Sequence, residues 1–334
     1  MTRLAWREAP ARSRRALGVL ALVLVLLPLV ADRYLLTTLI LVLTLACLGQ
    51  AWNIMMGFAG QLSLGNALYV GLGAYTGAVA YQFFGISPWL GMAAAIVVCV
   101  AAATVIGWLA FRFGISGTYF ALLTIAFAEF TRIGFDHLQI TGAAGGLFLP
   151  VNGEAAGKWW NLGGGPLLYY YLALALATAA TILVARLRQS PLGYRWLAVR
   201  EDPQAAQAAG INIFRARMMA MLISSGMTAV GGVFYGFYYR NLFPSQVFDI
   251  GRSIELILAP IIGGLGTVFG PIVGAIILTP LGEGLTGLVQ ELGLNAPGTK
   301  AIFYGITLMI IISLQPNGVW PWLARRLGLG RETK

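Results

Sequence analysis

The feature that most constrains this sequence is a run of 78 residues, 34–111, that contains no Asp, Glu, Lys or Arg. A membrane-spanning helix needs about 20 apolar residues, so the run is long enough for three spans. Three shorter uncharged runs, at 159–185, 256–282 and 301–324, each fit about one span. Only 10% of the 334 residues are charged, against roughly 25% in soluble domains. The pattern predicts an all-α polytopic membrane protein whose outer surface faces the lipid bilayer.

The apolar segments predict about ten membrane helices. In chain order they are expected near Ala16–Ala31, Tyr34–Met56, Asn66–Phe84, Pro88–Phe111, Thr118–Ile133, Pro166–Leu187 and Met218–Tyr239, then from Ser253 to a break at Gly263–Gly266, and near Val268–Leu288 and Ala301–Leu314. A glycine-rich loop is expected over Asp136–Gly165. The first segment follows a basic tail, so a signal peptide is the alternative there. The poor cleavage site before Asp32 favours an uncleaved helix.

The net charge of +10 is concentrated in three segments. Residues 1–15, 186–217 and 325–334 carry net charges of +4, +4 and +3. Because Lys and Arg are enriched on the cytoplasmic side of membrane proteins, both termini and the middle segment are predicted to be cytoplasmic. We therefore divide the chain into a basic tail at 1–15, a transmembrane domain at 16–316 with a cytoplasmic segment at 188–216, and a tail at 317–334. The basic residues are too dilute for a surface that binds nucleic acid.

One glycine pattern occurs in both halves of the chain. Gly-Leu-Gly-x-x-x-Gly is found at residues 71–77 and again at 264–270. Matching glycine-interrupted segments in two halves indicate an internal repeat around a central pathway. The match is short, so chance similarity within glycine-rich apolar sequence is the alternative.

A polar stretch at residues 57–66 separates two of the expected spans. Its side chains Gln61, Ser63 and Asn66 stand among glycines that permit a tight turn or a broken helix. Non-helical backbone at membrane depth must be covered by protein or line a water-filled cavity. The stretch is therefore either part of a translocation pathway or an ordinary interfacial loop. The full set of pathway candidates is Gln61, Ser63, Asn66, Thr76, Gly264, Gly266 and Thr267.

The basic middle segment contains signals for one short helix. Asp202 is a good N-cap, Pro203 suits the first helical position and Gly210 suits the left-handed position after a helix end. These predict a helix at Pro203–Ala209. So short a helix is marginal alone in water, so it must pack on something. Its alanine-rich surface could enter a groove on a partner, and a connector folded against its own chain is the alternative.

Signals for catalysis, metal binding and ATP binding are lacking in the sequence. Cys47 and Cys99 lie in apolar runs and His137 is the only histidine, so no catalytic or metal site is expected and no cofactor is assigned. The stretch at 293–300 ends Thr-Lys, the reverse of the order in a phosphate-binding loop. Glu129 and Arg132 are spaced to pair on one helix face. That pair is either a functional membrane charge or, with Asp136 nearby, an interfacial ion pair.

Three ordered motifs occur along the sequence. The first is Gly-Gln-Leu-Ser-Leu-Gly-Asn-Ala at 60–67, followed by Gly-Leu-Gly-Ala-Tyr-Thr at 71–76. The second begins Ser-Pro-Leu-Gly at 190–193 and continues through 197–202, Ala205-Ala206 and Gly210-Ile211-Asn212. The third is Gly-Gly-Leu-Gly-Thr at 263–267 with Gly270-Pro271. Together these motifs resemble those of bacterial branched-chain amino acid ABC-transporter permeases of the LivM type. The resemblance covers most of residues 34–315 and is less specific for the cargo than for the permease superfamily.

The resemblance implies a division of labour within an inner-membrane importer. Two related permease chains form the pore, two cytoplasmic ATPases bind the ATP and drive alternating access, and a periplasmic binding protein delivers the cargo, here Leu, Ile or Val. Short cytoplasmic permease helices dock on the ATPases. The matching residues here are Glu201, Asp202, Pro203, Ala205, Ala206, Ala209 and Gly210, although Gln204 stands where the family has an acidic residue.

Three other functions remain as alternatives. The same family could import urea or short-chain amides, because the motifs do not identify the cargo. A secondary transporter driven by H⁺ or Na⁺ needs buried ionisable residues, and the long uncharged runs argue against it. An intramembrane enzyme would need a catalytic set.

Overall fold

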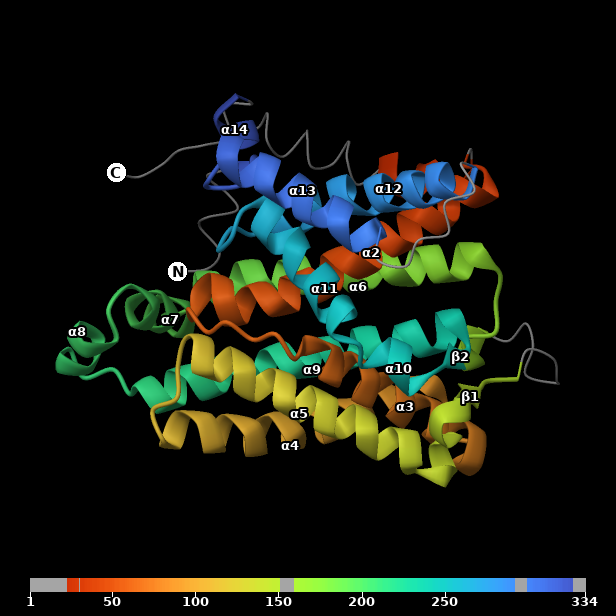
Figure 1. Ribbon diagram of the computed structural model, residues 1–334, viewed down its shortest axis with the longest axis horizontal. Helices are drawn as coiled ribbons and strands as arrows, with labels where there is room; N and C mark the ends of the chain where they lie inside the picture. Colours follow the sequence, from red (N-terminus) through yellow and green to blue (C-terminus); the bar gives the residue numbers. More distant parts are fainter. Residues whose placement is uncertain (1–22, 30, 151–158, 292–298, 327–334) are drawn as a thin grey trace.

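The computed structural model describes residues 23–29, 31–150, 159–291 and 299–326 as a bundle of helices (Figure 1). The longer helices are α2 (Arg33–Asn53), α3 (Asn66–Phe84), α4 (Pro88–Arg112), α5 (Thr118–His137), α6 (Pro166–Arg188), α9 (Ile213–Tyr239), α11 (Ile250–Gly263), α12 (Gly270–Glu291) and α13 (Thr299–Leu314). The short helices are α7 (Pro191–Glu201), α8 (Pro203–Ala208), α10 (Pro244–Val247) and α14 (Val319–Arg326). A π-helical segment at Ile54–Phe58 extends α2, and 3-10 turns lie at Leu27–Leu29, Gln139–Thr141, Ala143–Gly145 and Trp159–Asn161.

The two ends of the bundle differ in structure. Helices α7 and α8 project beyond one end, on the left in Figure 1. At the other end, strands β1 (Leu147–Phe148) and β2 (Asn241–Leu242) pair antiparallel, with Leu147 opposite Leu242. The segment predicted to be cytoplasmic and the β-ribbon therefore lie at opposite ends of the molecule.

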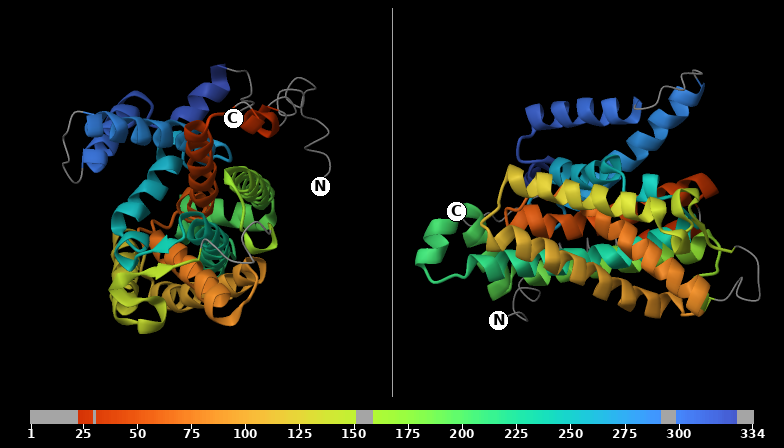
Figure 2. Two further views of the ribbon diagram at one scale, coloured as in Figure 1. Left: turned by 90° about the vertical axis from the view of Figure 1, so that its right-hand side faces the viewer. Right: turned by 60° about the horizontal axis from the view of Figure 1, so that its bottom comes forward.

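Helix α9 is the centre of the packing and lies against both α3 and α4. The contact with α3 is close because it is made through glycines. A Cβ atom added to Gly73 would lie 2.5 Å from the Ala229 carbonyl oxygen, and one added to Gly232 would lie 2.4 Å from the Val70 oxygen. Small residues that allow such backbone approach are typical of helix packing in membranes. Helix α2 packs on α6, α11 and α12, and α13 lies at the periphery (Figure 2).

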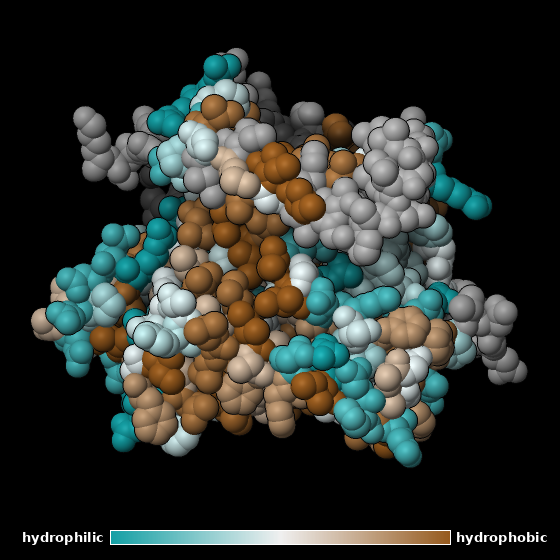
Figure 3. All heavy atoms as spheres, in the orientation of Figure 1, coloured by the Kyte–Doolittle hydropathy of each residue, from teal (hydrophilic) through white to brown (hydrophobic). Residues whose placement is uncertain are grey.

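The outer surface of the bundle is apolar over its middle. Figure 3 shows hydrophobic residues as a band across one face, with hydrophilic residues on both sides of it, at the end formed by α7 and α8 and towards the opposite end. Val97 on α4 and Phe130 on α5 are 69% and 74% exposed. Four helical segments among the described residues are long and apolar enough to cross a membrane: Arg33–Phe58, Pro88–Arg112, Pro166–Arg188 and Ile213–Tyr239. Large exposed apolar side chains on such helices fit a lipid-facing surface.

The expected helices agree with the structure in type and mostly in extent. The span predicted at 66–84 is α3 without change, and the break predicted after Gly263 is the end of α11. The span expected at Ala16–Ala31 and the tail at 1–15 lie largely outside the described residues, as does part of the C-terminal tail. Neither the count of ten spans nor the side on which the termini lie is tested by the structure.

Three sequence expectations are corrected. Helix α9 begins at Ile213 rather than Met218, because the Asn212 side chain caps it by accepting from the Arg215 amide at 2.9 Å. The region expected as a loop from Asp136 begins inside α5, and its described part contains 3-10 turns and β1. The two Gly-Leu-Gly patterns adopt different structures, since residues 71–77 lie within α3 whereas 264–269 form the turn that leads from α11 into α12.

Candidate functional site

The segment predicted to be cytoplasmic folds into two helices rather than one. Helix α7 ends at Glu201, and α8 begins at Pro203, so Asp202 is the only residue between them. Its Oδ1 accepts hydrogen bonds from the amides of Gln204 at 2.8 Å and Ala205 at 3.1 Å, as predicted for an N-cap. Gly210 follows with φ +83°, the left-handed conformation expected there.

Helix α8 touches its own chain mainly through one side chain. Ala206 is 4% exposed and belongs to the hydrophobic core. The remaining candidate residues Glu201, Asp202, Ala205, Ala209 and Gly210 are exposed, and Pro203 is half-buried. Packing of α8 against its own chain therefore accounts for the burial of Ala206, whereas Ala205 and Ala209 remain exposed. These residues belong to the end of the bundle where α8 projects (Figure 1).

The polar stretch at 57–66 is largely buried within the protein. The side chains of Gln61, Ser63 and Asn66 are 2–3% exposed. Ser63 Oγ donates to Asn66 Oδ1 at 3.0 Å, and the indole of Trp52 donates to the Ser63 carbonyl at 2.8 Å. This non-helical backbone is covered by protein, which is the condition for its presence at membrane depth.

The turn after α11 packs on the π-helical end of α2. Asn53 bridges the two: its Oδ1 accepts from the Gly266 amide at 2.9 Å, and its Nδ2 donates to the Thr267 carbonyl at 2.8 Å. One turn earlier, Gln50 Nε2 donates to the Val268 carbonyl at 2.6 Å. Two pathway candidates from the second half, Gly266 and Thr267, are thus held by α2. Sequence reasoning missed Gln50 and Asn53, although two amides three residues apart in an apolar span were a usable signal.

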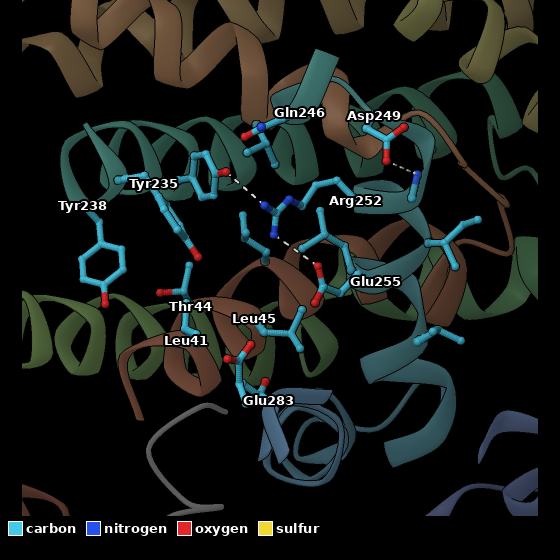
Figure 4. Close-up of a pocket in the computed structure, with 18 of the residues that line it drawn as sticks. Leu41, Thr44, Leu45, Tyr235, Tyr238, Gln246, Asp249, Arg252, Glu255 and Glu283 are labelled. Atoms are coloured by element: carbon cyan, nitrogen blue, oxygen red, sulfur yellow. Dashed lines mark hydrogen bonds and ion pairs between the residues drawn. The ribbon is translucent and has the colours of Figure 1, made fainter. Parts of the chain in front are cut away.

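A cavity of about 720 Å³ lies between α2, α9, α11, α12 and α13 (Figure 4). Its polar wall includes Tyr235, Gln246, Asp249, Arg252 and Glu255, and its apolar wall includes Leu41, Leu45 and Leu48 of α2. None of the seven pathway candidates lines it.

Arg252 is the central group of the polar wall. Its Nη2 donates to the Tyr235 hydroxyl at 3.0 Å, and its Nη1 donates to Glu255 Oε2 at 3.2 Å. The guanidinium carbon also lies 5.0 Å from the centroid of the Tyr235 ring. Asp249 caps α11 by accepting from the Gly251 amide at 2.9 Å. Charged residues inside a membrane bundle are functional candidates by default. In the sequence, Glu255 and Glu283 are the ends of an uncharged run, and that pattern alone does not predict a cavity between the helices.

The other charged candidate is an exposed network on α5. Arg132 forms ion pairs with Glu129 at 2.5 Å and Asp136 at 2.7 Å. The Glu129 side chain is 52% exposed. This agrees with an interfacial ion pair rather than with a buried functional charge. No group of three His, Cys, Asp or Glu residues able to hold a metal occurs within the described ranges.

Comparison with known proteins agrees with the motifs. The family model described as "Branched-chain amino acid transport system / permease component" matches residues 34–312. The LivM permease of Salmonella typhimurium, a high-affinity branched-chain amino acid transport protein, is 25% identical over 303 residues, which cover 84% of this chain and 69% of that protein.

Shorter matches show the breadth of the family. The LivH permease of Escherichia coli is 26% identical over 141 residues, 42% of this chain and 43% of LivH. The nucleoside ABC transporter permease NupB of Lactococcus lactis is 25% identical over 142 residues, 42% of this chain and 38% of NupB. No solved structure matches significantly. The family match and the apolar helices make this a multi-pass membrane protein, and the chain belongs to the permease components of branched-chain amino acid transport systems.

Proposed function

We propose that this chain is one permease subunit of an ATP-driven importer of the bacterial inner membrane, and that its cargo is a branched-chain amino acid. A related permease chain completes the pore, two cytoplasmic ATPases bind the ATP, and a periplasmic binding protein delivers the cargo. The match to both LivM and LivH supports a related second permease. Transport proceeds by alternating access, with the bundle moved through α8.

The observation that carries the ATP-driven part of this proposal is the exposed surface of α8. Ala205 and Ala209 carry no side-chain bulk beyond Cβ, and both are exposed at the end of the bundle where the basic segment projects. A short capped helix with a small-residue surface can enter a groove on a partner. Because the family consists of permease components, the fitting partner is the cytoplasmic ATPase of the transporter.

The first experiment substitutes Gly210 and a matched glycine in the complete reconstituted transporter. Gly210 and Gly114 have φ of +83° and +69°, and an added Cβ meets nothing within 4 Å at either position. Valine should strain both turns to a similar extent, but only Gly210→Val should reduce ATP-driven uptake. If the substitution weakens binding of α8 to the ATPase by about 1.4 kcal/mol, uptake should fall about tenfold. Membrane insertion should remain normal in both variants. Normal uptake by Gly210→Val, or failure of ATPase subunits to co-purify with the wild type, would refute the coupling role.

The cavity of Figure 4 favours an amino acid cargo over urea. A zwitterion with an aliphatic side chain needs a cation for its carboxylate, an anion for its ammonium group and an apolar wall. Arg252, Glu255 and the leucines of α2 supply these groups around one space. Urea is small and neutral and uses neither charge. A nucleoside, the cargo named for NupB, would use the tyrosines but has no need of an ion pair.

The cargo is tested by uptake of labelled leucine, urea and adenosine into vesicles that contain the wild-type complex. We expect leucine alone to accumulate. In Arg252→Gln the maximal rate of leucine uptake at saturating binding protein should fall about tenfold, the loss of one hydrogen bond to a charged group. Arg132→Gln is the control, because Arg132, like Arg252, pairs with a carboxylate three residues away but lies outside the cavity. Equal rates in the two variants would exclude the cavity from the pathway, and uptake of urea or adenosine would assign another cargo.

A further inference from the structure

Arg200, in the last turn of α7, connects the exposed helix α8 to the membrane bundle. Only Glu201 and Asp202 separate it from the first residue of α8. The junction between α7 and α8 is fixed by two interactions of Asp202. Its backbone amide donates to the Ala198 carbonyl of α7 at 3.1 Å, and its carboxylate caps α8. A displacement of α8 must therefore move the end of α7.

Helix α7 is anchored on α9 at Trp196, one turn before Arg200. Trp196 is fully buried, and its indole donates to the Ala216 carbonyl at 2.8 Å. Trp196 and Arg200 are four residues apart and so lie on the same face of α7. Between the fixed contact at Trp196 and the short junction at Asp202, Val199 is buried in the core and Arg200 is largely exposed. Arg200 nevertheless reaches the bundle, because its guanidinium hydrogen-bonds to a backbone carbonyl of the segment that extends α2.

The guanidinium of Arg200 meets the broken end of α2. Its Nη1 donates a hydrogen bond to the Gly57 carbonyl in the π-helical segment. Its aliphatic stem lies on Gly60, where an added Cβ would come within 3.1 Å of Arg200 Cγ. Gly60 has φ +67°, so this is the residue at which the chain turns out of the π-helix into the buried polar stretch.

The same guanidinium meets the turn after α11. A Cβ added to Gly266 would lie 2.7 Å from Arg200 Nη1 and 2.8 Å from the Gly57 oxygen. Gly266 has φ +73° and is held to α2 through Asn53. One charged group from the α7–α8 segment therefore contacts two interruptions of α-helical structure, the π-helix at the end of α2 and the turn after α11, which lie 209 residues apart in the sequence (Gly57 and Gly266).

We propose that Arg200 is the positioning residue that transmits displacement of α8 to both breaks at once, the end of α2 and the turn between α11 and α12. The inference rests on the function proposed above, since it requires a partner that moves α8. The breaks are the places where the bundle can change shape with little loss of α-helical hydrogen bonds, because the end of α2 is already a π-helix and the turn after α11 is non-helical. A guanidinium suits this role because its rigid planar fork keeps a fixed geometry that the ammonium group of a lysine cannot.

The test compares Arg200→Gln with Arg195→Gln in the complete reconstituted transporter, measuring ATP hydrolysis and cargo uptake together. Arg195 is exposed on the same helix, so its loss controls for charge. In Arg200→Gln we expect the ATPases to co-purify and hydrolyse ATP at the wild-type rate, while cargo moved per ATP falls about tenfold, the loss expected for one hydrogen bond from a charged donor. Arg200→Lys should give an intermediate ratio, and it serves as the test if the glutamine variant does not fold.

Three results would overturn the inference. An unchanged ratio of uptake to hydrolysis in both Arg200 variants would show that the contact transmits nothing. Loss of ATPase co-purification in Arg200→Gln would show that Arg200 binds the partner instead of the bundle. An equal fall in Arg195→Gln would show an effect of net charge. If the wild-type complex fails to couple hydrolysis to uptake, the proposed function fails first and this inference falls with it.

Discussion

Replacement of Asp202 by alanine should loosen α8 by a predictable amount. The Asp202 carboxylate accepts from the amides of Gln204 at 2.8 Å and Ala205 at 3.1 Å. Removal of an N-cap side chain costs about 1 kcal/mol. Helix α8 has six residues, too few to be stable by itself, so its folded population depends on this cap and on burial of Ala206. A loss of about 1 kcal/mol lowers the folding equilibrium of α8 about fivefold.

Hydrogen–deuterium exchange of the purified transporter measures this directly. In Asp202→Ala, backbone amides of residues 205–210 should exchange about fivefold faster, because exchange follows the local opening equilibrium. Asp202→Asn should exchange like the wild type, since asparagine caps helices as well as aspartate does. Ser190→Ala is a second control: Ser190 caps α7, accepting from the Gly193 amide at 3.3 Å, so its effect should stay in α7.

Two results would refute this reasoning. Unchanged exchange in Asp202→Ala would mean that the bundle or the partner holds α8 without the cap. Equal acceleration in Asp202→Asn and Asp202→Ala would mean that the negative charge of Asp202, rather than its hydrogen bonds, stabilises the helix.

The remaining predictions concern the bundle itself and are checked by thermal unfolding in detergent. Gly73→Ala should lower the unfolding temperature, because its Cβ would lie 2.5 Å from a backbone oxygen of α9. Such overpacking reduces the free energy of unfolding by about 1–3 kcal/mol. Gly134→Ala, where a Cβ meets nothing within 4 Å, should not lower it. Asn53→Ala should cost about 2–4 kcal/mol, because it leaves the Gly266 amide and the Thr267 carbonyl without their partner. A midpoint for Asn53→Ala equal to that of the wild type would show that water replaces the side chain.

The helices of this protein were largely predictable because the bilayer imposes a simple rule. A run of about 20 uncharged apolar residues has few alternatives to a helix in lipid, and the extent of α3 followed from it. Helix ends were predictable where a polar cap is local, as at Asp202 and Gly210. The start of α9 was missed because the charges of Arg215 and Arg217 suggested a loop, while the cap at Asn212 already marked a helix.

The cavity was not predictable from the uncharged runs that identified the spans. Arg252 and Glu255 stand at the edge of such a run, where a charge usually marks the membrane surface. Only the packing of α11 against α2 and α9 brings them next to Tyr235 and the leucines of α2. Whether a charge near the end of a span faces lipid head groups or a cavity depends on neighbouring helices, and a single sequence does not specify these.

The contacts around Arg200 and Asn53 show what a sequence can reveal about an interaction between distant segments: the position of a close approach, but not the segment that approaches. Their partners are backbone groups of Gly57, Gly266 and Thr267. Every residue has a backbone carbonyl and every residue except proline a backbone N–H, so these hydrogen bonds require no particular side chain on the partner. The close approach, however, excludes a Cβ atom: one on Gly57 would lie 2.8 Å from the Gly266 amide nitrogen. Glycine is thus the sequence signal of these contacts. That signal marks where another chain segment must come close, and the fold determines which segment it is.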